Sequence, residues 1–495
     1  MTTDRDKVRL IFGLKLRQLR NDRGLSTYDL ASRTGLSPSY LNEIEKGKKY
    51  PKTEKVFAIA KALETDYDTL ISLKVSKQLE PVVELLNSNI LSELPFDLFG
   101  IEPGYFLEVM ASAPAKLSAF ISTLIEIGRN YDLKVEQFYF SVLRTYQAMH
   151  DNYFEDLELE ADEFLASHPL PTPPEESTNW LSDVLVQEYG CTIEAYDDAA
   201  YPDLSSLRSV YLPEKNKLLL NNKLSPEQRA FTLAREVGYH QLRLTVRPLE
   251  SSVLEARSFD EVLNNFRASY FARAILIPRQ ALLLELLDLV AQPNWENEWL
   301  LAAMKPRTVT PEMFLLRMTN LLTSHFGLKE LFFLRFNQRD NLKFQLTKEL
   351  HLSKLHTPHG TARDEHYCRR QVSVSILNEL RQQQQSGQWD GKPICRAQRI
   401  TFSTSGNAYF VMSIAKSSPP TTTNSSINIG LPITDQLRSV FHYLDDPAIP
   451  TTLVGETCER CPIPDCRERA AEPVNLIREQ QIKNTQTTIE RLRFD

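Results

Sequence analysis

Three closely spaced cysteines near the carboxyl end are well suited to bind a metal. Cys458, Cys461 and Cys466 stand in the segment GETCERCPIPDCRER with the spacing C-x2-C-x4-C. A C-x2-C turn brings two thiolates to one ion, and a third thiolate four residues on can reach it. A closed site needs a fourth ligand, for which the upstream candidates are Cys368, Cys395, His356, His359 and His366.

The identity of the metal at this cluster is open from the spacing alone. Zinc would hold the carboxyl-terminal segment to its domain, whereas an iron–sulfur cluster would make the protein a redox or iron sensor. The alternative is a set of reduced thiols in a proline-rich turn. Six cysteines in 495 residues are too few for a disulfide framework, and the isolated Cys191 is expected in a strand core.

A second group of chemically interesting residues lies in the segment Phe231–His240, FTLAREVGYH. Zinc proteases place two histidines and a glutamate as HExxH on one helix, so that both imidazoles face the metal. Here Arg235 and Tyr239 occupy the two histidine positions, and only Glu236 is retained. The next residue, His240, lies about 100° further around the helix and cannot replace the lost ligand.

This helix resembles the motif helix of the IrrE/ImmA-type metallopeptidases, in which FTLAHELGH is the usual form. The resemblance implies a third ligand from a later helix reading E-x-x-A-x-x-F-A, where this chain has Asn265 at the acidic position. With all three ligands lost, we predict no peptidase activity and a surviving fold put to another use. That use is either binding of an anionic or polar small molecule or a structural hydrogen-bond cluster. The residues expected to bind such an effector are Arg235, Tyr239, Asn265 and Arg267.

The stretch Leu25–Gly47 predicts two short capped helices around a tight turn. Ser26 and Ser37 can each accept from the free N–H groups of a first helical turn. Gly35 supplies the turn, and Gly47 ends the second helix. Together with a helix before and another after it, this pattern is typical of the helix-turn-helix of DNA-binding proteins, and it resembles the Xre/Cro-repressor type over residues 8–72.

The DNA contacts expected from this motif follow from its docking geometry. Residues at the start of the second helix meet base edges, and lysines after it neutralise phosphates. Thr27 stands where the family usually has Gln, so that a base contact there would be weaker or different. The predicted DNA-binding residues are Thr27, Ser37, Ser39, Tyr40, Asn42, Lys46, Lys48, Lys49 and Lys52.

The charge distribution supports double-stranded DNA as a partner. Residues 1–61 contain 14 Lys and Arg against 7 Asp and Glu, a balance of +7 in a chain whose net charge is −7. A locally basic domain in an acidic protein indicates phosphate contact by that domain alone. The alternative is a helical bundle with a solvated basic face.

Length and composition predict several domains of a mainly α protein with an α+β carboxyl-terminal part. The chain has 495 residues, 42% hydrophobic residues and only 16 glycines. The sequence has no run of 18 apolar residues, so no membrane span is expected. The charged amino terminus has no apolar signal core, and a cytoplasmic protein is therefore expected. The predicted order is a five-helix helix-turn-helix domain (8–72), a helical linker or dimerisation region (74–167), a degenerate IrrE/ImmA-like domain (178–320), a small strand-containing regulator domain with the cysteine cluster (328–473) and a helical tail (474–495).

Several local patterns place secondary structure within these ranges. A proline-rich linker is expected at 168–177, a strand pair within 209–220, and helices at 226–244 and 259–276. Alternating residues predict hairpins at 330–350, turning at 339–341, and at 396–416. A polar loop is expected at 417–426.

The whole order resembles the short-chain fatty acyl-CoA regulators, a family of RamB-like transcription factors. The most specific segments are NNFRASYFA, beginning at Asn264, and the terminal cysteine motif. The resemblance implies Cys368 as the fourth metal ligand, and a homodimeric regulator of carbon metabolism that responds to an acyl-CoA. Two alternatives remain: a redox or metal sensor acting through the cysteine cluster, and an IrrE-type peptidase that cleaves a repressor.

Overall fold

The computed structural model describes residues 4–75, 96–100, 123, 126, 135–197, 199–250, 256–338, 343–352, 365–418 and 423–494. The chain divides into two compact units, residues 1–142 with 256–259, and residues 143–255 with 260–495. Several predicted features lie outside the described residues: most of positions 76–134 in the predicted helical region 74–167, the turn at 339–341, and the ligand candidates His356 and His359.

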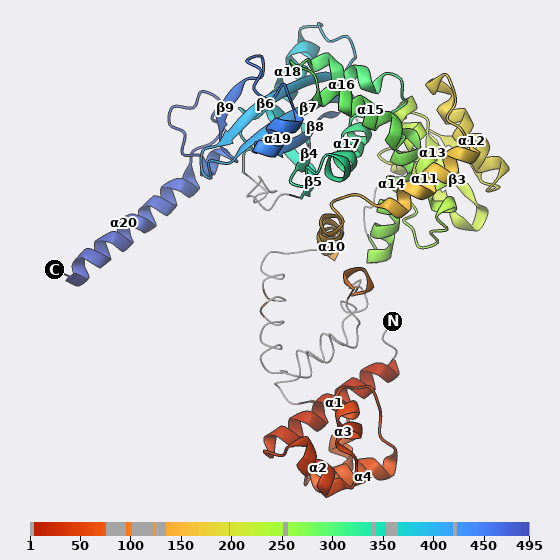
Figure 1. The fold of residues 1–495 in the computed structure, drawn as a ribbon, viewed down its shortest axis with the longest axis vertical. Coiled ribbons are helices and arrows are strands. Elements are labelled where there is room, and N and C mark those ends of the chain that lie inside the picture. Colours follow the sequence, from red (N-terminus) through yellow and green to blue (C-terminus); the bar gives the residue numbers. More distant parts are fainter. Residues whose placement is uncertain are drawn as a thin grey trace. The chain divides into compact units, whose positions relative to one another are not determined.

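One long helix and four short ones form the amino-terminal domain (Figure 1). They are α1 (Asp4–Asp22), α2 (Thr27–Thr34), α3 (Pro38–Glu45), α4 (Thr53–Ala62) and α5 (Tyr67–Ile71). Ser26 caps α2 in a capping box with Asp29, and Gly35 ends α2 at a φ of 69°. Ser37 caps α3 through the N–H of Tyr40. The two caps and the turn predicted from the sequence are confirmed.

The core of this domain brings α1 unusually close to α3. Leu30, Leu41 and Ile44 are completely buried in one apolar cluster. Gly13 of α1 faces the end of α3, where an added Cβ would lie 2.3 Å from the carbonyl oxygen of Ile44. Because that neighbour is backbone and cannot rotate away, the approach of the two helices requires glycine.

The second unit begins with helices and a small sheet. Its first helices include α11 (Glu155–Ser167) and α12 (Ser177–Gln187), which flank the predicted proline-rich linker. The three strands are β1 (Thr192–Tyr196), β2 (Ser209–Leu212) and β3 (Lys217–Asn221), in the order β1-β3-β2. β2 and β3 form the predicted strand pair, and β1 joins β3 in parallel.

Helices follow this sheet and supply most of the buried core of the unit. They are α13 (Pro226–Gln241), α14 (Phe259–Leu276), α15 (Arg279–Val290), α16 (Asn297–Met304) and α17 (Pro311–His325). α13 begins with a capping box made by Ser225 and Gln228, and Pro226 occupies its first position. One apolar cluster runs from α11 through these helices into the following sheet.

A six-stranded sheet dominates the carboxyl-terminal part. Its order is β5-β4-β8-β7-β6-β9, antiparallel except for the β6–β9 pair. The strands are β4 (Phe332–Gln338), β5 (Phe344–His351), β6 (Ile394–Phe402), β7 (Ala408–Ser418), β8 (Thr423–Pro432) and β9 (Thr451–Val454). β4–β5 and β6–β7 are the two predicted hairpins. The polar loop expected at 417–426 is wrong at both ends, because Ser417–Ser418 and Thr423–Ser426 pair in the β7–β8 ladder.

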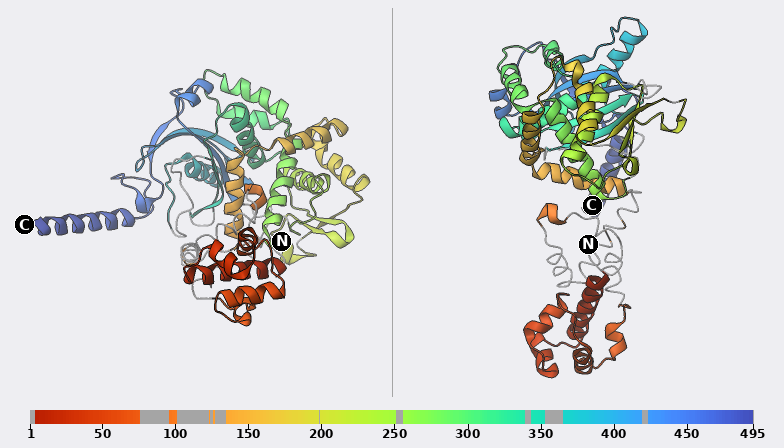
Figure 2. Two further views of the ribbon diagram at one scale, coloured as in Figure 1. Left: turned by 60° about the horizontal axis from the view of Figure 1, so that its bottom comes forward. Right: turned by 90° about the vertical axis from the view of Figure 1, so that its right-hand side faces the viewer.

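Helices cover both faces of this twisted sheet (Figure 2). Phe410 and Met412 of β7 point into the core shared with α17, whereas Tyr409 and Val411 point toward α18 (Val372–Gln385) on the opposite face. Since adjacent residues of a strand face opposite sides, a sheet buried on both faces has an almost continuous apolar run.

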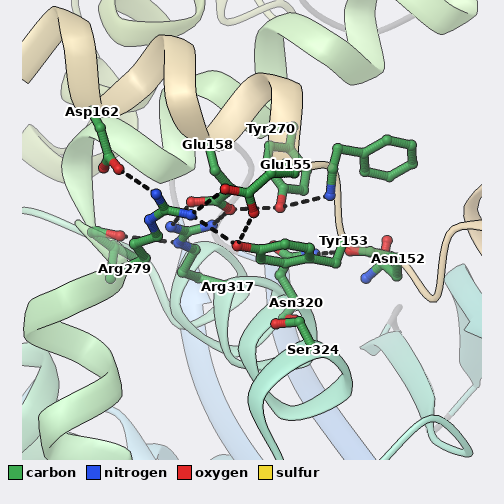
Figure 3. A network of polar contacts seen from close by, with 12 residues as sticks. Asn152, Tyr153, Glu155, Glu158, Asp162, Tyr270, Arg279, Arg317, Asn320 and Ser324 are labelled. Carbon is green, nitrogen blue, oxygen red and sulfur yellow. Dashed lines mark hydrogen bonds and ion pairs between the residues drawn. The ribbon is translucent and has the colours of Figure 1, made fainter. Parts of the chain in front are cut away.

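A buried ion pair joins α11 to α17 (Figure 3). The Arg317 Nη2 atom donates to Glu158 Oε2 at 2.7 Å, and both side chains are 1% exposed. Tyr270 donates its hydroxyl to Glu158 at 2.6 Å and so adds α14 to the network. Burial opposes the charge of Arg317, but hydrogen bonds to Glu158 raise the pKa of the guanidinium. These side chains hold three helices in a fixed arrangement.

The chain ends in the helix α20 (Val474–Phe494), which extends away from the sheet (Figures 1 and 2). Its residues from Ile477 to Arg493 are exposed. This confirms the predicted helical tail. Within the described residues, every helix is too short or too polar to cross a membrane.

Candidate DNA-binding surface, motif site and cysteine cavity

The helix α3 presents polar side chains at its start. Ser37, Ser39 and Asn42 are exposed, while Leu41 and Ile44 on the opposite side are completely buried. The hydroxyl of Ser37 accepts the N–H of Tyr40 at 3.2 Å, which fixes the first turn of the helix. The exposed face therefore offers one amide and two hydroxyls, groups that can hydrogen-bond to base edges.

Tyr40 and the lysines around α3 are partly engaged with one another. The ammonium of Lys55 lies 4.1 Å from the centre of the Tyr40 ring, a cation–π contact that the sequence analysis missed. Lys49 pairs with Glu43 at 2.8 Å, and this hydrogen bond raises the pKa of Lys49. Lys48 and Lys52 are exposed. Of the predicted phosphate contacts, Lys48 and Lys52 are therefore better placed than Lys49.

Two further basic residues of this domain serve its fold. Arg20 of α1 donates to both carboxylate oxygens of Glu45 at 2.6 and 2.9 Å, and Glu45 is buried. The hydrogen bond to Glu45 raises the pKa of Arg20. Lys15 donates to the carbonyl oxygens of Thr69 and Ser72, and its burial lowers its pKa. The positive balance of this domain therefore overstates the charge available to DNA.

The broken zinc motif on α13 contains an arginine that the sequence analysis did not single out. Arg247 donates from both terminal nitrogens to the two carboxylate oxygens of Glu236, each at 2.5 Å. Its guanidinium also lies 4.0 Å from the ring centre of Tyr211 and 3.8 Å from that of Tyr239. We call Arg235, Glu236, Tyr239, Arg247 and Asn265 the motif site.

Electrostatics keep the glutamate of the motif site ionised. Burial alone would raise the pKa of Glu236, but the hydrogen bonds from Arg247, and then the approach of His240 to 3.4 Å, hold it below its usual value. Burial also lowers the pKa of Arg235 and raises that of Tyr239. In place of a metal ion and its ligands, this motif holds a carboxylate matched by a guanidinium.

The structure brings together three of the four predicted effector residues. Tyr239 donates its hydroxyl to Asn265 Oδ1 at 3.0 Å, so that the former second and third ligand positions contact each other directly. Arg235 lies one helical turn before Tyr239 and interacts with it electrostatically. Arg267 does not join them, because it faces Asp156 at 3.7 Å and is partly exposed.

The cysteine cluster forms where two segments distant in sequence pair. Tyr367 and Thr457 form an isolated β-bridge, the N–H of Cys368 donates to the carbonyl of Glu456 at 3.1 Å, and that of Cys458 donates to His366 at 2.8 Å. As a result Cys368, Cys458, Cys461 and Cys466 line one cavity of about 10 Å³, roughly the space of one water molecule.

Two other candidates for the fourth ligand, Cys395 and His366, belong to the described residues, and each lies elsewhere or has another partner. Cys395 is buried in the core on β6, where burial raises its pKa to about 12. The Nδ1 atom of His366 lies 2.8 Å from Glu459. Cys368 is buried beside Cys458 and Cys461, which together with its burial raise its pKa.

The four thiols are the right chemical groups for a metal ion, but their side chains are not close enough together in this structure to hold one ion. All are free of disulfides, and Arg469 donates to the carbonyls of Cys458 and Cys461, which fixes the loop. Within the described residues, no three His, Cys, Asp or Glu side chains are spaced to hold a single ion. Binding would therefore need the side chains to close on one ion, or a larger group that bridges them.

Two segments match known protein families. Residues 16–70 match the helix-turn-helix model, and residues 188–293 match the IrrE N-terminal-like domain. The first covers most of α1–α5, and the second runs from before β1 through α15.

Individual relatives are distant. The HTH-type transcriptional regulator RamB of Mycobacterium tuberculosis, from strains CDC 1551 / Oshkosh and ATCC 25618 / H37Rv, is 23% identical over 286 residues, covering 54% of this chain and 57% of RamB. The chain thus spans little more than half the length of these curated relatives. A solved Mycobacterium tuberculosis transcriptional regulator aligns with 68% of this chain and 93% of its own at 18% identity, with a TM-score of 0.46.

Proposed function

From a chain that joins a helix-turn-helix domain to an IrrE-like domain and has RamB as a distant relative, we propose a sequence-specific DNA-binding transcriptional regulator. The observation that carries the proposal is α3, whose buried Leu41 and Ile44 leave Ser37, Ser39 and Asn42 exposed at its start. In this type of domain the second helix of the motif enters the major groove with its first residues toward the bases.

Such a regulator works as a homodimer in this proposal. One recognition helix reads only a half-site, and two half-sites about one helical turn apart give the affinity and specificity that regulation needs. The expected operator is an inverted repeat.

The motif site is the proposed switch. Arg235 and Arg208, which influence each other electrostatically, both have a pKa lowered by burial. These partly buried cations, with Glu312 also acting on Arg208, would contact the phosphates of an anionic effector, and the family resemblance suggests an acyl-CoA. The effector must bind one dimer geometry better than the other in order to change DNA affinity.

Peptidase activity is not part of the proposal. A zinc peptidase needs ligands at the positions held here by Arg235, Tyr239 and Asn265, and a general base free to activate water. Glu236 is instead bound at both oxygens by Arg247. Its retention is explained by that pairing.

A gel-shift series with genomic fragments tests the proposal. We expect one or a few fragments to be retained at salt concentrations that release bulk DNA, and the retention to change when an acyl-CoA is added. No fragment retained above non-specific background would refute DNA recognition. Retention that no acyl-CoA alters would refute only the effector.

A second candidate function, metal or redox sensing, is favoured by the four thiols around one cavity. Cys368, Cys458, Cys461 and Cys466 would hold zinc or an iron–sulfur cluster. Zinc would supply a structural crosslink, and a cluster would supply a redox-sensitive group. Metal analysis and an absorption spectrum after anaerobic purification separate the two. A metal-free protein of unchanged stability would refute both.

A further inference from the structure

A polar groove beside the cysteine cavity has features of a ligand site that the proposed function does not use. It runs along one face of α18, which lies on the outer face of the large sheet (Figure 1), and has a volume of about 470 Å³. This volume lies within the usual range for small-molecule sites. Ser375, Asn378 and Gln382 line it at spacings of three and four residues, so that they share one side of the helix.

The groove carries a surplus of positive charge. Arg369, Arg370 and Arg381 line it, and none of them makes an ion pair with another described residue. Its two carboxylates are Glu379 and Glu468. Glu379 is already neutralised, because its Oε1 atom accepts a hydrogen bond from Arg396. Three free guanidiniums therefore face one uncompensated carboxylate.

An unsatisfied acceptor adds a second requirement for a ligand. The Oδ1 atom of Asn378 is buried and has no hydrogen-bond partner among the described residues, although its side chain lines the groove. Leaving a buried carbonyl oxygen unpaired is unfavourable, and a rotation of this side chain into the groove would let a bound hydroxyl or amine satisfy it. The groove thus offers donors for an anion at its arginines and one acceptor between them.

We propose that this groove binds a small polyanion, a compound with a phosphate or diphosphate group and a neighbouring hydroxyl or amine. Arg370 and Arg369 would hold the anion near the start of α18. Arg381 would hold the far end of the ligand. This site lies on a different element from the motif site and shares none of its residues, so that variants of the groove separate binding here from effector binding there.

The groove shares three lining residues with the cysteine cavity. Arg369, Arg370 and Glu468 line both. A polyanion that draws the two arginines into the groove would therefore change access to the partly exposed thiol of Cys466. This gives the proposal a readout that is independent of DNA binding.

Calorimetric titration of the full chain with inorganic pyrophosphate, and separately with ADP as a hydroxylated diphosphate, tests the proposal. We expect each chain to bind one molecule of the probe. The double variant R370Q/R381Q should bind it with an affinity lower by roughly tenfold or more, since each charge-assisted hydrogen bond contributes about that factor. The matched control is Arg491→Gln on the exposed helix α20, which should bind like the wild type.

Asn378→Asp provides a second variant that keeps the arginines and the shape of the side chain. Its added carboxylate should weaken binding of both probes. In the wild type, ADP should slow the reaction of Cys466 with a thiol reagent, whereas in the two variants it should not. Equal affinity in the wild type, R370Q/R381Q and Asn378→Asp would overturn the proposal. The proposal would also be overturned if a short random DNA duplex displaced pyrophosphate and if binding of that duplex required Arg370 and Arg381. The groove would then be a DNA-contacting surface.

Discussion

Arg247 binds Glu236 through two parallel hydrogen bonds of 2.5 Å, and this pair occupies the motif that binds a metal ion in zinc peptidases of the IrrE type. The guanidinium lies between the rings of Tyr211 and Tyr239, which shield it from water. A cation is thus kept beside the glutamate, but as a side chain. The pairing gives Glu236 a structural role that needs no metal ligands at the positions of Arg235, Tyr239 and Asn265.

Replacing this arginine should destabilise the second unit. Arg247→Met leaves the carboxylate of Glu236 buried without its partner, which typically costs about 3–5 kcal/mol. Denaturant unfolding measures the loss. Arg229→Met, at a partly exposed position on α13, the helix that carries Glu236, is the control and should change stability by less than about 1 kcal/mol. The double change R247M/E236Q should recover part of the loss, and a loss as large as that of Arg247→Met alone would contradict the pairing.

The same pair predicts a pH dependence. The pKa of Glu236 lies below its usual value of 4.5 in the folded chain, so the carboxylate stabilises the fold above pH 4.5 and this contribution disappears as the pH falls through the lowered pKa. The stability difference between the wild type and Glu236→Gln should therefore be largest near neutral pH and shrink below pH 4.5. A difference that grows on acidification would show the opposite sign of linkage.

The elements that the sequence predicted well are those fixed by local chemistry. Ser26, Ser37 and Gly35 act only on the helix ends and the turn in which they stand, so their roles could be predicted from the sequence. The hairpins were equally local, although the β7–β8 ladder extends into a polar segment. There, pairing with neighbouring strands outweighs the low strand preference of Asn424 and Ser425.

The parts of the sites that were missed depend on contacts between distant segments. Arg247 follows α13 in a loop, and nothing in its own neighbourhood indicates that it turns back onto Glu236. Lys55 reaches Tyr40 from another helix. Cys368 was selected by family resemblance, and only the pairing of residues 366–368 with 456–458 places it beside the other thiols. Arg267 was misplaced although it stands only two residues after Asn265, because that spacing of about 200° turns the two side chains toward nearly opposite sides of α14.

Gly13 offers a test of the helix packing in the amino-terminal domain. Gly13→Ala should raise helix propensity but force α1 away from the backbone of Ile44, and the clash should dominate with a net loss of about 1–3 kcal/mol. The temperature at which the domain unfolds and its affinity for DNA should both be lowered. Asn21→Ala, an exposed position on the same helix, should leave both nearly unchanged. A stabilised Gly13→Ala variant would contradict the close approach of α1 and α3.

Two substitutions on the proposed DNA surface should have different signatures. Asn42→Ala should cost about 1–3 kcal/mol on the operator and little on random DNA, because an amide that reads a base contributes only at the matching sequence. Lys48→Ala should weaken binding to both, and reduce the salt slope by about one. Lys61→Ala, on α4, is the charge-matched control. If Asn42→Ala weakened operator and random DNA equally, Asn42 would not read a base.

Gly455 tests whether the cysteine cavity is a metal site. A Cβ at this position would lie 2.8 Å from the Sγ atom and 2.9 Å from the Cβ atom of Cys461, so Gly455→Ala must displace that thiol. If the four cysteines hold a metal, the variant should lose at least about half of its metal content and about 1–3 kcal/mol of stability, since overpacking and loss of a ligand act together. Elemental analysis and thermal unfolding measure the two effects. Cys191→Ala removes a buried thiol just before β1, in the large apolar core, and should leave the metal content unchanged. Wild-type metal content in Gly455→Ala, or a metal content in the wild type of zero, would rule out a role for Cys461 as a ligand.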